Sequence, residues 1–497
     1  MTDTTMPNWL RQRAALTPDR VAYETENETV DFLTLYQQVS AVADRLGSLG
    51  IRSGDRVALL GENSLEFIRF FHALMAIGAV AVPLNTRLTA EEEAWQVADS
   101  GAGWLITDPA CHEKALSVCE KKVCRLLTMQ QVRKQPAGRS GLPAEADLNQ
   151  PCTIIYTSGT TGHPKGVILT LGNHWWNATG SILNLGFRAD DKWLCCVPLF
   201  HVSGISIVMK NVIYGMPVVL SRKFNPQAAN RQIRENGVTM MSVVTNMLRR
   251  MLDALGEDGY PERFRCMLLG GGPAPLPLLN CCREKGVPVY QTYGLTETAS
   301  QMATLAPEFM FDKLGSAGKP LFPGQIRIVS EGQDQGPNVP GEIAVKGLNV
   351  TSGYWRRPEA TRKAIRDGWL YTGDIGYLDP DGFLYVLDRR KDLIISGGEN
   401  VYPAEIESVL TGHPCVQEAG VIGIKDEQWG MVPYAFVKTK AGCRFSEAEM
   451  LQYCSSHLAK YKVPVHIRKI KELPRNASRK LLRRKLFDFI PDSQVTD

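Results

Sequence analysis

Short apolar runs that end in polar turns and lead into helical spacing recur in the first part of the chain. Arg56 to Leu60 predicts a strand, Leu65 to Gly78 has apolar residues at helical spacing, and Ala79 to Leu84 predicts the next strand. This order indicates a parallel sheet covered by helices. Later apolar runs continue the pattern at Val218 to Leu220, Cys266 to Leu269 and Val287 to Tyr290. Loops that follow strands of such sheets are where ligands bind.

Beyond Lys313 the pattern changes to short strands with frequent glycine and proline. The runs Gln325 to Val329, Gly341 to Lys346 and Phe383 to Leu387 predict an antiparallel, barrel-like portion. Two amphipathic stretches, Pro403 to Leu410 and Ala448 to Leu458, are typical of a small α+β domain. We therefore predict an α/β fold with a large N-terminal domain of parallel-type βαβ sheets plus a barrel-like β portion (1–390), and a small α+β C-terminal domain (391–497).

Composition excludes several classes of protein. The 497 residues are 44% apolar and carry a formal charge of +4, which gives no reason to expect nucleic acid as a partner. The 12 cysteines include no Cys-x-x-Cys pair, so we expect reduced thiols rather than a disulfide framework or a zinc site. Met1 to Leu10 does not read as a secretory signal, and the longest apolar stretch, Phe70 to Leu84, is short of the roughly 20 residues that span a bilayer. We expect a cytoplasmic protein without a membrane span.

A polar loop that follows the predicted strand Cys152 to Tyr156 is the first candidate for chemistry. Glycines bring backbone N–H groups close to an anion, and hydroxyls and a lysine complete a cradle for phosphate. It is not the common P-loop, because Pro164 and Gly166 stand where that motif requires glycine and a hydroxyl residue. An ordinary surface turn remains the alternative. The predicted phosphate-binding residues are Thr157, Ser158, Gly159, Thr160, Thr161, Gly162 and Lys165.

Five further segments follow this loop in a characteristic order. They are Gly270-Gly271-Gly272-Pro273-Ala274, Tyr293-Gly294-Leu295-Thr296-Glu297-Thr298, Tyr371-Thr372-Gly373-Asp374, Asp388-Arg389-Arg390-Lys391-Asp392 and Pro474-Arg475-Asn476-Ala477-Ser478-Arg479-Lys480. Together the six segments resemble the adenylate-forming superfamily of acyl-CoA synthetases, luciferases and peptide-synthetase adenylation domains. The resemblance runs along nearly the whole chain and implies ATP, Mg²⁺ and coenzyme A as ligands.

The resemblance implies a role for each segment. Adenine would lie against the loop Gly270, Gly271, Gly272, Pro273 and Ala274, which could also be a simple strand-exit turn. Thr296 would contact the α-phosphate and Glu297 would bind Mg²⁺, although the pair could also be a helix cap. Asp374 would accept hydrogen bonds from the ribose hydroxyls, and Arg389 would reach the ribose and phosphate.

The family also implies a catalytic lysine and a mobile small domain. Lys480 would sit between the substrate carboxylate and the α-phosphate, offsetting charge in the transition state. Arg479 stands before it where the family usually has glycine, and a solvated lysine in a basic tail is the alternative. Lys391 matches the hinge of the small domain. Gly397 and Gly398 would leave room for the pantetheine arm of coenzyme A.

The acid is suggested by segments near the ATP motif. His201 matches the histidine that borders the acyl site in this family, and the stretches 198–215, 269–279 and 291–301 are similar to the branch that ligates o-succinylbenzoate to coenzyme A in menaquinone biosynthesis. That acid keeps a second, aromatic carboxylate, which needs hydroxyls, water or a cation to receive it. Thr292, Ser300 and Gln301 are the candidates. An aryl- or medium-chain acyl-CoA synthetase and a non-catalytic nucleotide-binding protein are the alternatives, and a homodimer is the default assembly.

Overall fold

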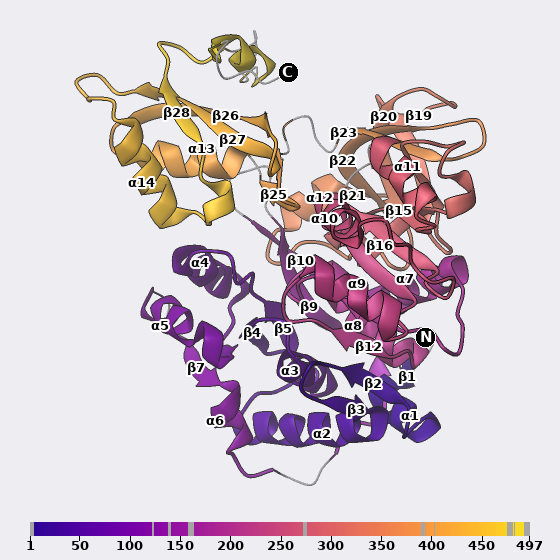
Figure 1. Cartoon of the computed structure of the whole chain (residues 1–497). Coiled ribbons are helices and arrows are strands. Elements are labelled where there is room, and N and C mark those ends of the chain that lie inside the picture. Colours follow the sequence, from indigo (N-terminus) through magenta and orange to yellow (C-terminus); the bar gives the residue numbers. More distant parts are fainter. Residues whose placement is uncertain are drawn as a thin grey trace. The chain divides into compact units, whose positions relative to one another are not determined.

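The computed structural model describes residues 4–121, 124–137, 141–157, 164–271, 276–388, 392, 394–401, 403–474, 481 and 483–491. The chain divides into two compact units (Figure 1). The large unit comprises 1–86, 97–155 and 166–387, and the small unit comprises 87–96, 156–165 and 388–497. The predicted α/β class, with a large N-terminal part and a smaller C-terminal part, is confirmed.

A six-stranded sheet carries the βαβ unit predicted from the apolar pattern. Strand β4 (Arg56–Leu60) pairs in parallel with β5 (Val80–Pro83), and α3 (Leu65–Ala76) connects them. The helix begins where Ser64 accepts a hydrogen bond from the N–H of Phe67, at 3.1 Å. The sheet order is β10 (Lys165–Thr170), β9 (Pro151–Thr157), β5, β4, β6 (Trp104–Thr107) and β7 (Arg125–Thr128).

A second, 15-stranded sheet joins a parallel to an antiparallel part. Strands β13 (Met240–Val244), β14 (Cys266–Gly270) and β15 (Val289–Leu295) are parallel neighbours. Strand β17 (Ser316–Pro320) pairs with both β16 (Ser300–Leu305) and β23 (Leu384–Asp388), so the antiparallel strands continue the parallel sheet. The remaining strands are β2 (Val21–Glu24), β3 (Thr29–Asp31), β11 (Trp193–Cys195), β12 (Val218–Leu220), β18 (Gln325–Ser330), β19 (Gln333–Asp334), β20 (Gly341–Lys346), β21 (Ile365–Arg366) and β22 (Trp369–Leu378).

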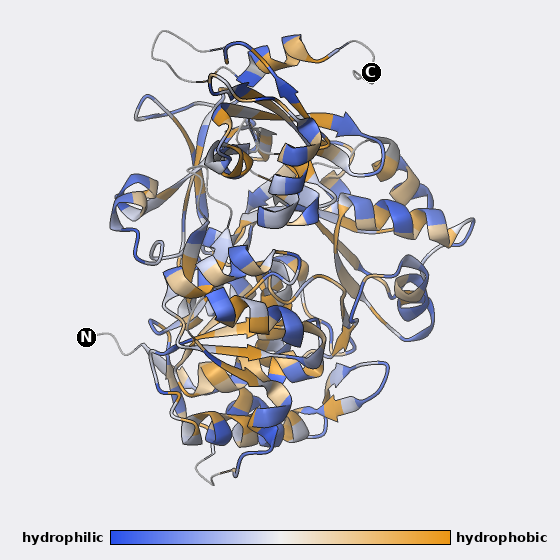
Figure 2. Cartoon of the chain, turned by 90° about the vertical axis from the view of Figure 1, so that its left-hand side faces the viewer, coloured by the Kyte–Doolittle hydropathy of each residue, from blue (hydrophilic) through white to orange (hydrophobic). Residues whose placement is uncertain are grey.

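Helices cover these sheets, and the strands between them are the more hydrophobic elements (Figure 2). Two helices matter for the site, α7 (Leu171–Leu185) and α8 (Val202–Tyr214), and both bury most of their residues. The other helices of the large unit are α1 (Trp9–Leu16), α2 (Phe32–Ser48), α5 (His112–Lys121), α6 (Met129–Arg133), α9 (Pro226–Glu235), α10 (Thr245–Leu255), α11 (Leu276–Glu284) and α12 (Pro358–Ala364). Strands β1 (Thr5–Pro7) and β8 (Glu145–Asp147) form a separate pair.

The small unit is built on a five-stranded sheet. Its long hairpin, β26 (Val416–Asp426) and β27 (Gly430–Thr439), packs against α13 (Pro403–Gly412). The two predicted amphipathic helices are present as α13 and α14 (Glu447–His457). The remaining strands are β24 (Ile394–Ser396), β25 (Glu399–Val401) and β28 (His466–Lys469). Within the described ranges, no helix is both long and apolar enough to cross a membrane.

A charged cluster lies in the interior of the small unit. The ammonium of Lys462, which is only 4% exposed, donates to Glu405 at 2.7 Å and to Glu92 at 2.9 Å. Glu92 comes from α4 (Ala90–Ser100). Burial alone would lower the pKa of Lys462, but the charges of Glu405 and Glu92 outweigh it and raise that pKa. This lysine is therefore a paired structural cation.

Candidate active site

The structure describes about half of the predicted site residues. They are Thr157, Lys165, His201, Gly270, Gly271, Thr292, Thr296, Glu297, Ser300, Gln301, Asp374, Gly397 and Gly398. The other predicted residues lie outside the described ranges and are Ser158, Gly159, Thr160, Thr161, Gly162, Gly272, Pro273, Ala274, Arg389, Lys391 and Lys480.

A tight hairpin holds the segment Tyr293 to Thr298. Strands β15 and β16 are antiparallel with an irregular register at Tyr293 and Gly294. A Cβ on Gly294 would lie 1.8 Å from the carbonyl oxygen of Ser300, so only glycine fits there. Ala299 and Ser300 both have positive φ, 54° and 117°, a conformation that costs free energy in residues with a side chain. The surrounding structure must therefore hold this turn in place.

A polar stripe on α7 provides that support. Asn173, Asn177 and Ser181 are spaced four apart and so lie on one face of the helix. The side-chain amide of Asn177 donates to the carbonyls of Thr298, at 3.2 Å, and Gln301, at 3.0 Å. All three side chains are buried: Asn177 holds the hairpin backbone, Ser181 donates to the side chain of Gln301, and Asn173 donates to the carbonyls of Leu348 and Val350.

Glu297 projects from this hairpin toward the segment that borders β10. Its carboxylate accepts from the hydroxyl of Tyr354 at 2.9 Å, and its carbonyl accepts from the N–H of Thr351 at 2.7 Å. The next residue after Tyr354, Trp355, donates its N–H to the carbonyl of Gly166 at 2.8 Å. The fold thus brings Glu297 to the strand that leaves the predicted phosphate loop.

The oxygen donors around Glu297 fit a magnesium ion that arrives with a nucleotide. Magnesium usually takes one or two carboxylates and fills its remaining positions with water and phosphate oxygens. Glu297 is half-buried and offers one such carboxylate. Within the part of the chain that the structure describes, no group of three or more His, Cys, Asp or Glu residues could hold a metal ion.

Asp374 is joined to the same hairpin from β22. The hydroxyl of Tyr293 donates to its carboxylate at 2.7 Å, and Asp374 is only 4% exposed. Its backbone N–H donates to the hydroxyl of Thr372 at 3.1 Å. A carboxylate has about four acceptor positions, so it can serve Tyr293 and a sugar hydroxyl together. Two of the six predicted segments therefore meet directly.

Gly270 and Gly271 end the neighbouring strand β14. Gly271 has φ of 91°, which favours glycine, and a Cβ on Gly270 would lie 3.5 Å from the methyl group of Thr292. The Thr292 hydroxyl donates to the carbonyl of Ala303 at 2.9 Å and lies 3.0 Å from the hydroxyl of Thr304. The glycine at the end of β14 and the candidate pocket residue Thr292 therefore lie next to each other.

A buried lysine that sequence reasoning missed contacts the candidate pocket. The Nζ of Lys210 donates to Oε1 of Gln301 at 2.9 Å, and the same oxygen accepts from Ser181 at 2.8 Å. Lys210 is 2% exposed, lies 5.4 Å from the ring centroid of Trp193, and makes no ion pair with an acidic side chain of the described residues. Burial lowers its pKa to about 7. The signal was present in the sequence, because Lys210 is the single charged residue of α8.

His201 lies immediately before α8. It is half-buried, and its ring centroid lies 4.6 Å from that of Phe200. A Cβ on Gly204 would lie 2.2 Å from the carbonyl oxygen of Pro198, so this glycine lets the first turn of α8 fold back on the chain that precedes it. His201 and Lys210 thus come from one helix and its entry turn.

The AMP-binding enzyme model matches residues 10–355, and the AMP-binding enzyme C-terminal domain model matches 405–480. This chain belongs to the AMP-binding enzyme family. The predicted membership of the adenylate-forming superfamily is confirmed.

Named relatives of this AMP-binding enzyme cover nearly its whole length. A 2-succinylbenzoate–CoA ligase of Geobacillus kaustophilus is 57% identical over 493 residues, which are 99% of this chain and 100% of the relative. The o-succinylbenzoate CoA synthetase (MenE) of Bacillus subtilis, solved as a double mutant with the product analogue OSB-NCoA, is 48% identical with a TM-score of 0.93, covering 98% of this chain and 99% of that chain. The same synthetase in complex with ATP and magnesium ion is 48% identical with a TM-score of 0.76, covering 98% and 100%.

The two glycines that we predicted to border the path of coenzyme A form a hairpin turn in the small unit of this AMP-binding enzyme. Gly397 and Gly398 connect β24 to β25 with φ of 58° and 85°, which two-residue turns between antiparallel strands require. The N–H of Gly397 donates to the carbonyl of Trp429 at 2.9 Å, and a Cβ there would lie 2.7 Å from that indole ring. The turn explains both glycines, and a contact with coenzyme A stays a prediction.

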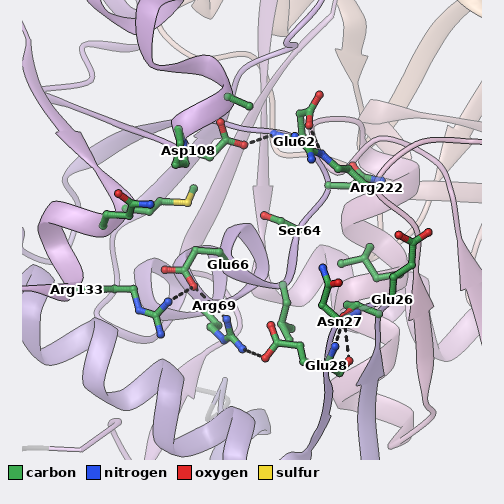
Figure 3. Close-up of a pocket in the computed structure, with 18 residues that line it drawn as sticks. Glu26, Asn27, Glu28, Glu62, Ser64, Glu66, Arg69, Asp108, Arg133 and Arg222 are labelled. Atoms are coloured by element: carbon green, nitrogen blue, oxygen red, sulfur yellow. Dashed lines mark hydrogen bonds and ion pairs between the residues drawn. The ribbon is translucent and has the colours of Figure 1, made fainter.

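The large unit also contains a cavity of about 560 Å³ with several charged side chains in its walls (Figure 3). None of the predicted site residues lines it. Several of its charged side chains are paired with one another: Arg69 contacts Glu28 at 2.9 Å and Glu66 at 3.1 Å, and Arg222 contacts Glu62. The motif segments meet at the hairpin and not at this cavity, so the hairpin is the candidate active site.

Proposed function

We propose that this chain is an ATP-dependent 2-succinylbenzoate–CoA ligase of menaquinone biosynthesis. The acid, also called o-succinylbenzoate, and ATP would give an acyl-adenylate and pyrophosphate, and the thiol of coenzyme A would then displace AMP. The assignment of this acid as the substrate is supported by the 57% identity to a named 2-succinylbenzoate–CoA ligase along essentially the full length of both chains. The hairpin of β15 and β16 would position the residues for the first step.

The nucleotide would lie along the ends of β14, β15 and β22. Glu297 would hold Mg²⁺, which neutralises phosphate charge when bound. Asp374 would accept from the ribose hydroxyls, and Thr296 would donate to the α-phosphate. The loop that begins at Gly270 would face adenine, and the loop from Thr157 to Lys165 would bind phosphate. The hydrogen bonds that join Tyr293 to Asp374 and Tyr354 to Glu297 support this common site.

Residues outside the described ranges carry further proposed roles, which rest on the resemblance alone. Lys480 would hold the succinyl carboxylate against the α-phosphate, and Arg389 would bind ribose and phosphate. Lys391 would be the hinge between domains 1–390 and 391–497. Gly397 and Gly398 would border the path of coenzyme A.

Lys210 would receive the aromatic carboxylate of the substrate. A buried ammonium whose partner is a neutral amide oxygen retains a large unmet attraction for an anion. Gln301, Thr292 and Ser300 would complete the polar end of the pocket, and His201 would border the acyl chain. A carboxylate beside Lys210 would favour the charged ammonium and so raise its pKa from about 7.

The substrate assignment is tested by release of pyrophosphate with ATP and Mg²⁺. The acids compared are 2-succinylbenzoate, benzoate, octanoate and a blank, followed by mass analysis after coenzyme A is added. We expect release with 2-succinylbenzoate alone and formation of its CoA thioester. Release with benzoate or octanoate instead would overturn the acid but keep the chemistry, whereas no release with any acid would favour a nucleotide-binding protein.

The role of Lys480 is tested by separating the half-reactions. Lys480→Ala should abolish pyrophosphate release while largely sparing thioester formation from supplied acyl-adenylate. Equal loss of both half-reactions would contradict that role.

The assembly and location are also part of the proposal. A cytoplasmic location fits the use of ATP and coenzyme A and the 12 free cysteines. A homodimer is the commonest assembly for such enzymes in general. Light scattering after size-exclusion chromatography would distinguish it from the monomer of 55.0 kDa.

A further inference from the structure

Two thiols on the large unit lie unusually close together. The Sγ atoms of Cys119 and Cys124 are 2.7 Å apart, compared with about 2.05 Å in a covalent disulfide. Cys119 lies near the end of α5, and Cys124 stands directly before β7, the edge strand of the six-stranded sheet (Figure 1). Because α5 packs against β7, the fold itself holds the two sulfur atoms within reach of each other.

These two thiols are also accessible, unlike most cysteines of the chain. Both are half-buried, whereas Cys196, Cys266 and Cys282 are buried. Burial raises the pKa of Cys196 to about 11 and the pKa values of Cys266 and Cys282 to about 12, so these thiols are poor nucleophiles at neutral pH. Burial raises the pKa of Cys119 as well, while the hydrogen bond with Cys124 lowers it.

We propose that Cys119 and Cys124 form a reversible disulfide by exchange with small-molecule disulfides. One protein thiolate attacks a sulfur of oxidised glutathione and releases one glutathione thiolate, leaving a mixed disulfide. The second protein thiolate then attacks the protein sulfur of that mixed disulfide and releases the second glutathione. In total, the two protein thiols are oxidised to a disulfide, and one molecule of oxidised glutathione is reduced to two molecules of glutathione. The two protons of the protein thiols pass to the two released glutathione thiolates.

The site is distinct from the proposed active site and does not depend on the proposed function. Neither sulfur belongs to the segments that would bind ATP or the acid. Cys415 and Cys443 in the small unit are also half-buried and share a side-chain hydrogen bond. They provide an internal comparison, because they are a second pair of neighbouring, half-buried thiols in the same chain.

Peptide mapping tests the proposal directly. The full-length protein is incubated with oxidised glutathione, blocked with N-ethylmaleimide and digested with trypsin. Cleavage after Lys114, Lys121, Lys122 and Arg125 should give the peptide 115–121 joined to the tripeptide 123–125, at about 2 Da below their summed masses. Dithiothreitol should separate them again. Both peptides recovered as their N-ethylmaleimide adducts after full exposure would overturn the proposal.

A trapping variant supplies the second measurement. In Cys124→Ser the mixed disulfide on Cys119 cannot be resolved, so glutathione should accumulate there about tenfold above its level in the unaltered protein. The control Cys443→Ser should form the joined peptides as the unaltered protein does. Stable glutathione on Cys119 in the unaltered protein, without joined peptides, would show that the two sulfur atoms do not react with each other.

Discussion

Lys210 and Lys462 are both buried lysines, but their surroundings differ in one decisive respect. Lys462 lies between the carboxylates of Glu405 and Glu92, whereas Lys210 donates to the neutral amide oxygen of Gln301. Burial is nearly the same for both, at 4% and 2% exposed. The pKa of Lys462 is nevertheless raised, while that of Lys210 is lowered to about 7. The counter-charge, and not burial, separates the two lysines.

This difference shows how a lysine that can bind an anionic ligand is distinguished from a structural one. A lysine with internal carboxylates completes its own ion pairs and contributes to the structure of the unit that contains it. A lysine without them is unfavourable in the unliganded protein and gains most from a substrate that brings an anion. On this argument Lys462 is structural, and Lys210 is the residue that we propose selects an acid with two carboxylates.

The largest effect is expected from Lys462→Met, which leaves the buried carboxylate of Glu405 and the half-buried carboxylate of Glu92 without their cation. Breaking such a cluster costs about 3–5 kcal/mol, because the remaining charges are desolvated and unpaired. Hydrogen exchange of peptides from α13 and β27 should report a loss of protection of this size. Lys438→Met is the matched control, since Lys438 pairs with the well-exposed Glu472 at 2.8 Å and should cost less than about 1 kcal/mol. Equal loss of protection in the two variants would contradict the structural role of Lys462.

Lys210→Met should damage catalysis instead of stability. We expect kcat/KM for 2-succinylbenzoate to fall about a hundredfold, since a desolvated carboxylate would lose its charged partner. The analogue 4-oxo-4-phenylbutanoate, which lacks the aromatic carboxylate, should lose little. Lys192→Met is the control, because Lys192 precedes Trp193 in the chain but pairs with Glu24 at 2.8 Å. An equal fall of kcat/KM for both acids in Lys210→Met would show that the lysine does not bind the second carboxylate.

The pH dependence of this selectivity should follow Lys210. Since the pKa of Lys210 is lowered to about 7, the ratio of kcat/KM for 2-succinylbenzoate to that for the analogue should fall about fivefold between pH 7 and pH 8. The pKa of His174 is lowered to about 3 by burial and then by Lys210, and burial raises the pKa of Cys266 to about 12. Neither neighbour therefore titrates in this range. A ratio that is flat with pH would remove Lys210 from recognition of the acid.

Lys210 should also affect how the free energy of unfolding depends on pH. Between pH 7 and its ordinary pKa of 10.5, the unfolded chain holds a proton on Lys210 that the folded chain does not. Stability should therefore rise with pH across this window, and Lys210→Met should lack the rise. Lys462 has the opposite sign, because its pKa is raised on folding and its contribution is lost only as pH rises through that raised value.

The smallest effect is expected from Ser181→Ala. The Ser181 hydroxyl helps to hold the amide of Gln301 in the orientation that accepts from Lys210. Its loss should raise KM for 2-succinylbenzoate about two- to fivefold, the size of one neutral hydrogen bond, with no change for the analogue. The same rise for both acids would indicate a general loosening of the hairpin.

Local patterns predicted the elements well. The strands Arg56 to Leu60 and Gly341 to Lys346 have the predicted bounds, and α3 ends two residues before the predicted Gly78. Strand β15 begins two residues later and runs five residues further than its predicted end at Tyr290, because the motif residues themselves continue the strand against β16. Pairings such as Ser316 with Tyr385 join distant segments and leave no trace in a local pattern.

The motif segments were predictable from the sequence, whereas the contacts that bring them together depend on packing; the roles of their residues stay predictions. Glu297 and Asp374 were identified from their segments, but their partners Tyr354 and Tyr293 emerge only when the chain is folded. Lys210 was missed because an apolar helical run predicts a core helix, and one lysine in it does not change that pattern. Lys210 is a candidate for binding an anion because its partner is a neutral amide oxygen and not a carboxylate, which only the folded structure shows.

The hairpin that presents Glu297 also limits how this enzyme could be redesigned. Glu297 and Gln301 are four residues apart on one turn, which Gly294, the strained Ala299 and Ser300, and the amide of Asn177 hold rigid. If the hairpin binds the nucleotide as we propose, a substitution in β16 intended to admit a different acid would disturb the nucleotide site as well. A change at position 210 removes a hydrogen bond to the side chain of Gln301 but leaves the backbone hydrogen bonds of the turn to Asn177 in place. Engineering of acid preference should begin at position 210 and keep the hairpin as a fixed part shared by every variant.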